Sequence, residues 1–511
     1  MSEQLALLPG YLTAHLQLTL FALLLGTAFS VPAGVLVTRM KWLDQPVLGT
    51  ASVIQTIPSL ALLAVMVPAL AALGVQSIGF LPAFIGLTLY SVLPILRNTV
   101  TGLAGVDPAL VEAARGVGMT PMQRLRRVEL PLAMPVILAG IRTSTVLTVG
   151  VATLSTPVGA PSLGNYIFSG LQTRNLTAVL VGCVAAAALA QVLDGLVRGL
   201  GAAIVQRKKG WAAVVLTTIG LLYGYTGVSL VRDLGARDAG RIVIGAKTFT
   251  EQYILSEVLA GHIAETTGAA TEVASSLGST VAFDALRAEE IDVYIDYSGT
   301  IWATIMGRDT APDGRDAVLN EVTQFLREAH GVEVAGALGF ENAYALAMRR
   351  PQAEEIGVRS IGDLAAYARR LAIGGDYEFF GRPEWIAIRD TYGLAFASQR
   401  TMDSSLMYQA VASEQVDVIS AFSTDGRIAA LDLVVLDDER GAIPPYDALI
   451  LAGPRLVRER PDVVAALRQI TDTIGADRMR RMNLAVDQDG ASPAAVAELF
   501  LQELRAARST Q

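Results

Sequence analysis

Long apolar runs dominate the first 231 positions of the chain. Six of them have about the 20 residues that a helix needs to cross a bilayer, and they lie at 13–37, 47–73, 78–96, 133–153, 177–197 and 211–231. The pattern predicts an all-α bundle of six transmembrane spans. Polar positions at Gln55, Pro58 and Ser59 interrupt the second span. Such groups face either a cavity or a neighbouring helix, and the sequence leaves both possibilities open.

The pattern changes near residue 241, where short apolar runs begin to alternate with amphipathic ones. The runs 241–247, 270–276 and 291–297 are typical of buried strands, and helical faces lie between them. A capping-box pattern, Thr248 through Glu251, begins the first of these helices. This βαβαβ order predicts a parallel, doubly wound sheet. A second alternating set across 343–422 completes a two-lobed α/β domain.

Composition agrees with this division of the chain. The 511 residues are 52% hydrophobic and 17% charged, with a mean hydropathy of +0.45. That balance is too apolar for a wholly soluble protein and too charged for a wholly embedded one. The net charge of -8 gives no indication of nucleic-acid binding. The single cysteine, Cys183, lies in an apolar run and excludes a disulfide framework.

Basic residues orient the spans. They cluster in alternate connections, as Arg39, Lys41, Arg97, Arg115, Arg124, Arg126, Arg127, Arg198, Arg207, Lys208 and Lys209, and Arg174 is the exception. The positive-inside rule then places the N-terminus outside and the 97–132 connection on the cytoplasmic side of the membrane. We expect a transmembrane domain over 1–210, a tethering helix and linker over 211–239, and an extracytoplasmic domain over 240–511.

The connection between the third and fourth spans carries the most specific motif. Asp107-Pro108 favours a helix start, Gly118 a helix end, and Thr120 through Gln123 a second helix start. Its spacing resembles the EAA loop of ABC importer permeases, and the matching residues are Glu112, Ala113, Ala114, Gly118, Leu130 and Pro131. Val128 stands where that family usually has Ile. An ordinary basic cytoplasmic loop is the alternative, and the spacing favours the EAA loop.

The resemblance implies that this loop docks on a cytoplasmic ABC ATPase subunit. The chain has no G-x-x-x-x-G-K-[ST] phosphate loop, so we expect ATP to be bound and hydrolysed on the separate subunit. The three histidines are far apart in the sequence and lack the spacing of a metal site. We therefore expect a protein that is not an enzyme and holds no cofactor or metal of its own.

The second half carries a further resemblance, from about 241 to 455. The first strand and the motifs KTFTEQ, SLGST, DYSGT and FSTDG resemble the substrate-binding domains of quaternary-amine importers. That family takes up glycine betaine, choline, carnitine and similar solutes. Together the two halves resemble a permease fused to its receptor. By resemblance we expect a homodimer of this chain to form the translocation path.

The ligand site is expected where parallel strands end. A quaternary ammonium donates no hydrogen bond and is bound by aromatic faces. The resemblance assigns these to Tyr297, Tyr344, Tyr408 and Phe422, the last usually Tyr in relatives. It assigns the grip on a ligand carboxylate to Lys247, Thr300 and Arg382, and Arg suits bidentate capture. Any one Tyr taken alone is more often a core residue. Other aromatics that could line the cleft are Tyr294, Trp302, Tyr377, Phe379, Phe380 and Trp385.

Two alternatives remain at this stage. The ligand could be another trimethylammonium compound such as ergothioneine, which has an imidazole-thione ring and would use the same cage and clamp. The chain could also be a membrane-anchored solute sensor. A sensor would need a cytoplasmic output element, and it would leave the EAA loop unexplained.

Overall fold

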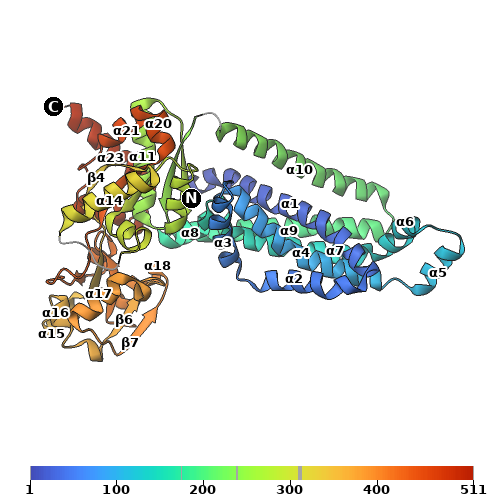
Figure 1. Cartoon of the computed structure of the whole chain (residues 1–511), viewed down its shortest axis with the longest axis horizontal. Coiled ribbons are helices and arrows are strands. Elements are labelled where there is room, and N and C mark those ends of the chain that lie inside the picture. Colours follow the sequence, from blue (N-terminus) through green and yellow to red (C-terminus); the bar gives the residue numbers. More distant parts are fainter. Residues whose placement is uncertain (1, 174, 238–239, 309–313, 510–511) are drawn as a thin grey trace. The chain divides into compact units, whose positions relative to one another are not determined.

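The computed structural model describes residues 2–173, 175–237, 240–308 and 314–509, which form two compact units (Figure 1). Unit 1 comprises Met1–Phe168 and Thr177–Ala239, and unit 2 comprises Ser169–Leu176 and Gly240–Gln511. Arg174, the exception to the charge pattern, lies outside the described residues. Each unit has its own helices and packing, so each is described by itself.

Unit 1 is a helical bundle. Its elements are α1 (Ser2–Arg39), α2 (Asp44–Thr56), α3 (Ser59–Ala72), α4 (Phe80–Ala104), α5 (Pro108–Gly116), α6 (Pro121–Arg124), a π-helical turn (Leu125–Glu129), α7 (Leu130–Ala152), α9 (Leu176–Val205) and α10 (Lys209–Arg237), and α8 (Gly164–Gln172) runs from this unit into the other. Among the described residues, five helices are long and apolar enough to cross a membrane, and a bent pair makes up to six. The expected number of spans agrees with this bundle.

The second expected span is not one straight helix. It is divided into α2 and α3, which are bent by 99° at Ile57 and Pro58. Pro58 has no N–H to donate, and its ring disfavours the helical conformation of the preceding residue. Ile57 accordingly adopts φ -67° and ψ 129°, which is extended backbone. The polar interruption that the sequence shows is therefore a break in the helix.

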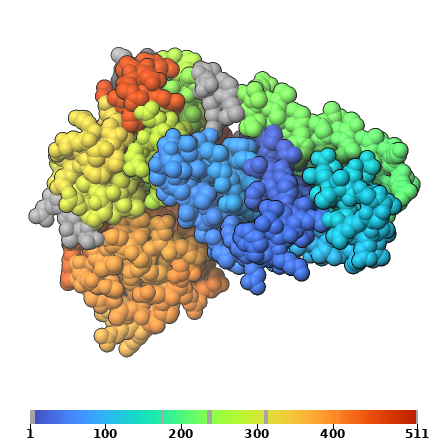
Figure 2. Space-filling view, turned by 45° about the vertical axis from the view of Figure 1, so that its right-hand side comes forward, coloured from blue at the N-terminus to red at the C-terminus, as the bar shows by residue number. Residues whose placement is uncertain are grey.

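Apolar side chains cover the outer surface of this bundle. On α10, which is green in Figure 2, Val214, Leu221 and Val228 are exposed, and on α9 Val184 and Val192 are exposed. Exposed apolar faces on helices of this length are what a hydrocarbon environment requires.

Unit 2 begins with a five-stranded sheet of order β2-β1-β3-β10-β4. Its strands are β1 (Ile242–Lys247), β2 (Thr271–Leu277), β3 (Val293–Tyr297), β4 (Glu333–Glu341) and β10 (Asp447–Ala452), and its first helices are α11 (Thr250–Thr267) and α12 (Ser279–Arg287). The pairs β1–β2 and β1–β3 are parallel, as expected, but β10 is antiparallel to both β3 and β4. The parallel arrangement predicted for the βαβαβ segment is therefore confirmed, and the whole sheet is mixed because β10, a strand far along the chain, inserts between β3 and β4.

The second sheet has the order β7-β6-β8-β5-β9. Its strands are β5 (Tyr344–Arg349), β6 (Ala372–Gly375), β7 (Ser398–Thr401), β8 (Val418–Phe422) and β9 (Leu433–Val435), with α17 (Pro383–Tyr392) and α18 (Ser404–Ala412) among its helices. The chain passes between the sheets twice, from β4 to β5 and from β9 to β10. A hydrogen bond links the two connecting segments, in which the Asn342 N–H donates to the Tyr446 carbonyl at 2.9 Å. Two lobes with two connecting segments are thus present, as the sequence indicates.

Candidate ligand-binding site

A cavity of about 350 Å³ opens in unit 2, lined by residues from both lobes. Strand ends supply Lys247 from β1, Tyr297 from β3 and Phe422 from β8. Of the seven residues expected to bind ligand, six line this cavity: Lys247, Tyr297, Thr300, Tyr344, Arg382 and Phe422. Tyr297 and Phe422, which are 125 positions apart in the sequence, line the same cavity. They meet because the carboxyl ends of strands in both sheets point to one cleft.

Aromatic rings form one part of the cavity wall. Tyr344 on β5 pairs in register with Phe422 on β8, and their ring centroids lie 5.1 Å apart at 44°. Tyr446 lies 6.1 Å from Tyr344 at 81°, and Phe249 lies 6.1 Å from Tyr297. All five line the cavity. Five aromatic rings on the wall of one cavity can surround a cation that has no hydrogen-bond donor.

Sequence reasoning missed two of these rings. Phe249 belongs to the KTFTEQ motif that follows β1, so its position beside a strand end was a usable signal. Tyr446 immediately precedes β10, a strand that the sequence pattern did not predict. Tyr377, one of the further aromatics considered, also lines the cavity and is 72% exposed.

Tyr408 lies behind the wall of the cavity. It is not among the described residues that line the cavity, and its side chain is fully buried. Its hydroxyl accepts a hydrogen bond from the Phe422 N–H at 3.1 Å, and the Arg427 guanidinium lies 3.9 Å from its ring centroid. The structure gives Tyr408 a place in the core beneath Phe422, where it supports the wall.

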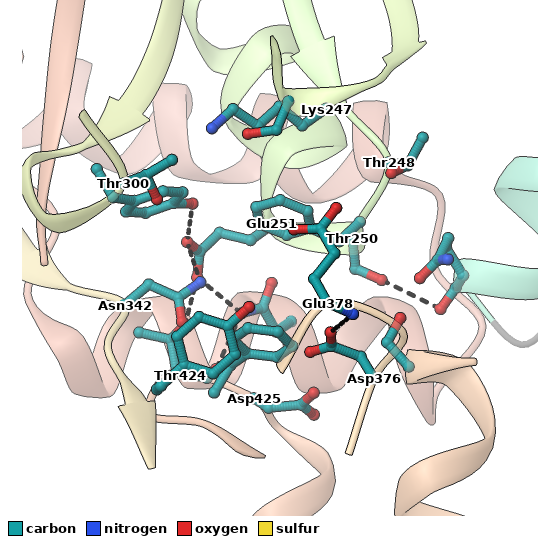
Figure 3. A pocket seen from close by; sticks show the side chains of 18 of the residues that line it. Lys247, Thr248, Thr250, Glu251, Thr300, Asn342, Asp376, Glu378, Thr424 and Asp425 are labelled. Carbon is teal, nitrogen blue, oxygen red and sulfur yellow. Dashed lines mark hydrogen bonds between the residues drawn. The ribbon is translucent and has the colours of Figure 1, made fainter. Parts of the chain in front are cut away.

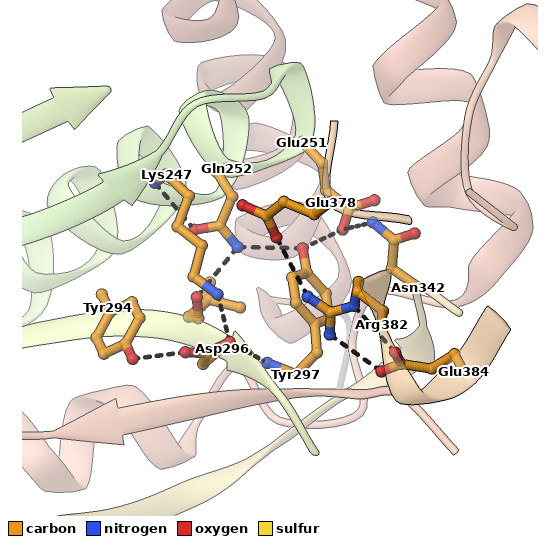
Figure 4. A network of polar contacts seen from close by, with 11 residues as sticks. Lys247, Glu251, Gln252, Tyr294, Asp296, Tyr297, Asn342, Glu378, Arg382 and Glu384 are labelled. Carbon is orange, nitrogen blue, oxygen red and sulfur yellow. Dashed lines mark hydrogen bonds and ion pairs between the residues drawn. The ribbon is translucent and has the colours of Figure 1, made fainter. Parts of the chain in front are cut away.

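Lys247 forms an ion pair within the protein. Its ammonium donates to Asp296, which is fully buried, and only 5% of the Lys247 side chain is exposed (Figure 4). The same nitrogen lies 5.6 Å from the Tyr297 ring centroid. The charge of Lys247 is thus already balanced inside the wall of the cavity.

Arg382 is also paired with protein carboxylates. Its Nε and Nη2 donate to the two oxygens of Glu384, each at 3.0 Å, and its Nη1 donates to Glu378 at 3.3 Å (Figure 4). Burial opposes charge on both groups, yet the hydrogen bonds between them raise the pKa of Arg382 and lower the pKa of Glu384. The guanidinium lies 5.2 Å from the Tyr344 ring centroid, so Arg382 borders the aromatic wall.

Glu251 is the buried centre of the polar wall (Figure 3). Its carboxylate accepts hydrogen bonds from the hydroxyls of Tyr297 and Thr424, and from the amides of Asn342 at 3.0 Å and Asn483 at 3.2 Å. These donors come from both lobes and from one of the connecting segments. Burial raises the pKa of Glu251, and the four hydrogen bonds oppose that effect only in part.

The expected capping box at Thr248 through Glu251 was therefore wrong. Helix α11 begins at Thr250, its N-cap is Phe249, and no side chain caps it. In a capping box the Glu251 carboxylate would accept a hydrogen bond from one backbone N–H. In the structure it accepts instead from four donors that are distant in sequence.

The EAA-like segment has the local structure that its sequence predicts. The Asp107 carboxylate accepts from the Ala109 N–H at 2.9 Å, and Thr120 and Gln123 form a reciprocal capping box. Gly118 adopts φ +78°, a conformation that favours glycine, between α5 and α6. Glu112, Ala113, Gly118 and Pro131 are exposed, Leu130 is half-buried and Ala114 is buried.

An ion-pair cluster holds the end of this segment. Glu129 is 4% exposed and accepts from Arg124 at 2.7 Å and from Arg39 at the end of α1. It lies in the π-helical turn that leads into α7. Sequence reasoning counted both arginines as loop charges and did not identify their shared acceptor.

Comparisons with known proteins match each half of the chain. Residues 240–503 match the family described as the substrate binding domain of ABC-type glycine betaine transport system. Residues 27–209 match the family described as binding-protein-dependent transport system inner membrane component.

Individual similar proteins match either most of the chain or a part of it. The chain is 29% identical to the ergothioneine transport permease/ergothioneine binding protein of Helicobacter pylori, over 88% of this chain and 82% of that one. It is 47% identical to a choline transport system permease protein of Bacillus subtilis, over 35% of this chain and 80% of that one. A crystal structure of a glycine betaine/carnitine/choline ABC transporter is similar at 29% identity and a TM-score of 0.47, covering 51% of this chain and 98% of that chain.

Proposed function

This chain belongs to the family of substrate-binding domains of ABC-type glycine betaine transport systems, and we infer that it takes up a quaternary ammonium compound. It is the fused permease and receptor of an importer of the glycine betaine, choline and carnitine type, and a multi-pass inner-membrane protein. The observation that carries this inference is the presence of both family matches on one chain. The permease family implies an ABC ATPase partner and a small ligand.

We propose that the ligand's ammonium group occupies the aromatic part of the cavity. Tyr297, Tyr344 and Phe422 would contact it, with Phe249 and Tyr446 completing the enclosure. Each ring face contributes roughly 0.5–2 kcal/mol to binding a desolvated cation. Closure of the two lobes around the ligand would then present the loaded receptor to the permease.

The polar end of the site would include Lys247, Thr300 and Arg382. Lys247 and Arg382 remain candidates for a ligand carboxylate, but each already pairs with a protein carboxylate. A ligand carboxylate would reach Arg382 most readily by displacing Glu378, whose side chain is 69% exposed. Thr300 carries no charge, and its hydroxyl can donate a hydrogen bond to a ligand carboxylate.

The transport cycle would use two copies of this chain and two copies of a separate ATPase. The exposed α5–α6 segment, residues 107–131, is the proposed docking point for the ATPase.

Unit 2 would lie outside the cytoplasm and the α5–α6 segment inside it, as the distribution of basic residues favours. Labelling of single cysteines placed at residues 116 and 330 in whole cells, in a chain with Cys183→Ser, tests that orientation. Labelling of residue 116, but not of residue 330, by a membrane-impermeant reagent would overturn it.

A second candidate substrate is ergothioneine. The relative from Helicobacter pylori is named for it and aligns over both halves of this chain. Ergothioneine also carries a trimethylammonium group, so the same aromatic wall would receive it. The cavity of about 350 Å³ is of the size that small-ligand sites have.

Calorimetric titration of the purified full chain with glycine betaine, choline, carnitine and ergothioneine tests the proposal. We expect at least one compound to bind, and Tyr344→Ala to weaken that binding by about tenfold or more through loss of a cage face. Failure of all four compounds to bind would contradict the quaternary-amine assignment and leave only the importer class.

A further inference from the structure

Acidic residues outnumber basic residues on the described wall of the cavity. Among the described lining residues three are basic, Lys247, Arg382 and Arg427, and six are acidic, Glu251, Asp376, Glu378, Asp403, Asp425 and Asp487. Each of the three basic groups is already engaged by a protein carboxylate. Arg427 donates to both oxygens of Asp425 through Nε, at 2.9 and 3.1 Å. Lys247 is paired with Asp296, and Arg382 is paired with Glu384.

Three buried oxygen atoms on the described cavity wall, by contrast, lack a hydrogen-bond donor. The Oδ1 atoms of Asn342 and Asn483 and the Oδ2 atom of Asp376 are buried and accept no hydrogen bond among the described residues. Asn342 is 8% exposed and Asn483 is 4% exposed. The corresponding unmatched donor on the wall is a single Nη1 of Arg427. Buried acceptors without donors cost free energy unless a bound molecule supplies the donors.

Asp376 is the acceptor best placed beside the aromatic wall. It follows β6, and its Oδ1 accepts from the backbone N–H of Glu378 at 2.8 Å (Figure 3). The same oxygen accepts from the backbone N–H of Phe379 at 2.9 Å. These two bonds fix the carboxylate in place. The Oδ2 atom is left for another partner.

The electrostatics agree with that placement. Burial raises the pKa of Asp376 because the charged form lacks solvent. Burial raises the pKa of the Tyr344 hydroxyl, and the negative charge of Asp376, which lines the same cavity, raises it further. A ligand seated against Tyr344 would therefore be within the field of Asp376.

We propose that Asp376 Oδ2 accepts a hydrogen bond from the ligand, and that the cavity selects a quaternary ammonium compound bearing a hydroxyl or N–H donor. This inference rests on the proposed function of the cavity and narrows its substrate class. Glycine betaine has no hydrogen-bond donor and would leave Asp376 unsatisfied. Choline and carnitine carry a hydroxyl, and ergothioneine carries ring N–H groups.

The first test compares ligands on the unaltered full chain, reconstituted in nanodiscs and titrated by calorimetry. Each donor-bearing compound is compared with glycine betaine, and choline is compared with its O-methyl ether, which differs only by the donor and one methyl group. We expect the best donor-bearing compound to bind about tenfold more tightly than glycine betaine, because a buried acceptor left unpaired carries such a penalty. Glycine betaine binding as tightly as every donor-bearing compound would overturn the inference.

The second test uses Asp376→Asn. This substitution retains Oδ1 for the two backbone N–H groups and replaces the Oδ2 acceptor with a donor, so the loop keeps its local bonds. We expect the preference for the best donor-bearing compound over glycine betaine to fall from about tenfold to about twofold or less. An unchanged preference would show that Asp376 does not receive the donor.

A matched control is Glu378→Gln, which removes one negative charge from the same loop but leaves Asp376 intact. Because Glu378 also pairs with Arg382, this control compares only ligands that match in their carboxylate, choline with its O-methyl ether and carnitine with glycine betaine. The order within each pair should be preserved. Loss of the preference in this control as well as in Asp376→Asn would assign the effect to general charge and contradict the inference. Failure of every compound to bind to the unaltered chain would instead contradict the proposed function.

Discussion

At the scale of single residues, Glu251 ties together parts of unit 2 that are distant in sequence. Its four donors lie in β3, in the β4–β5 connection, after β8 and in α22 (Ala476–Asp487). A buried carboxylate costs free energy unless such donors satisfy it. Loss of Glu251 would leave all four donors without this acceptor, so these segments are stabilised together.

Glu251 should make the stability of unit 2 depend on pH. Burial raises its pKa above the ordinary value of 4.5 in the folded chain. The protonated carboxyl therefore stabilises the fold below the unfolded pKa, and this contribution is lost as the pH rises through the folded pKa. We expect Glu251→Gln to flatten that dependence and to cost about 1–3 kcal/mol at low pH. Thermal unfolding of the detergent-solubilised chain across the acidic range checks this, and parallel curves for both proteins would contradict it.

Tyr344 and Tyr408 should differ in their effects on ligand binding. Tyr408→Phe removes the hydroxyl that accepts from the Phe422 N–H but keeps the ring against Arg427. We expect it to destabilise the fold by about 1 kcal/mol and to change ligand affinity less than threefold. Tyr344→Leu should weaken binding by about tenfold or more, because it removes a face of the cavity. Titration and thermal unfolding of both variants would separate ligand contact from support of the core. Equal losses of affinity in the two variants would indicate that Tyr408 also contacts the ligand.

At the scale of elements, a buried carboxylate ties the end of the α5–α6 segment to the bundle, and Val111 of α5 packs against the apolar cluster of Val106, Ala133 and Ile137. Glu129 accepts from Arg39 of α1 and from Arg124 of α6, and it lies in a π-helical turn before α7. Irregular turns of this kind inside helices are frequent at functional positions. A displacement of the proposed docking segment would be transmitted to α1 and α7 through these ion pairs.

Glu129→Ala should uncouple the segment from the bundle. It would leave Arg124, whose side chain is 10% exposed, without its acceptor, and removing one partner of a buried pair costs about 3–5 kcal/mol. We expect ligand affinity to be unchanged and ligand-stimulated ATP hydrolysis to fall in proteoliposomes that contain the ATPase subunit. An equal loss in affinity and hydrolysis would indicate general unfolding of the chain.

At the scale of the whole molecule, covalent fusion keeps the receptor near its permease. For a short linker the effective concentration of the receptor is about millimolar. A protease site inserted between Arg237 and Gly240 should lower transport after cleavage, and roughly millimolar amounts of released unit 2 should restore it. Uptake assays before and after cleavage in proteoliposomes check this. Undiminished transport after cleavage and removal of unit 2 would contradict any role for the fusion.

The sequence by itself determined the features that depend on neighbouring residues. Apolar runs of span length, the caps at Asp107 and Thr120, and the strands that end at Lys247, Tyr297 and Phe422 all follow from local periodicity and turn chemistry. The EAA spacing and the strand-end motifs also sufficed to place the chain in its family. Six of the seven expected ligand residues meet at one cavity, because the ends of strands in a wound sheet converge.

Only the tertiary structure decided which partner each polar or aromatic group takes. Glu251 fits a local capping box, yet its donors lie 46 to 232 positions away. Tyr408 has the motif of a cage residue but lies beneath Phe422, and Tyr446 reaches the cavity through β10, which pairs antiparallel with β3. Lys247 and Arg382 carry the charges that a carboxylate needs, and the fold pairs each with a buried acid. Long-range pairing depends on the three-dimensional path of the chain, which local patterns do not encode.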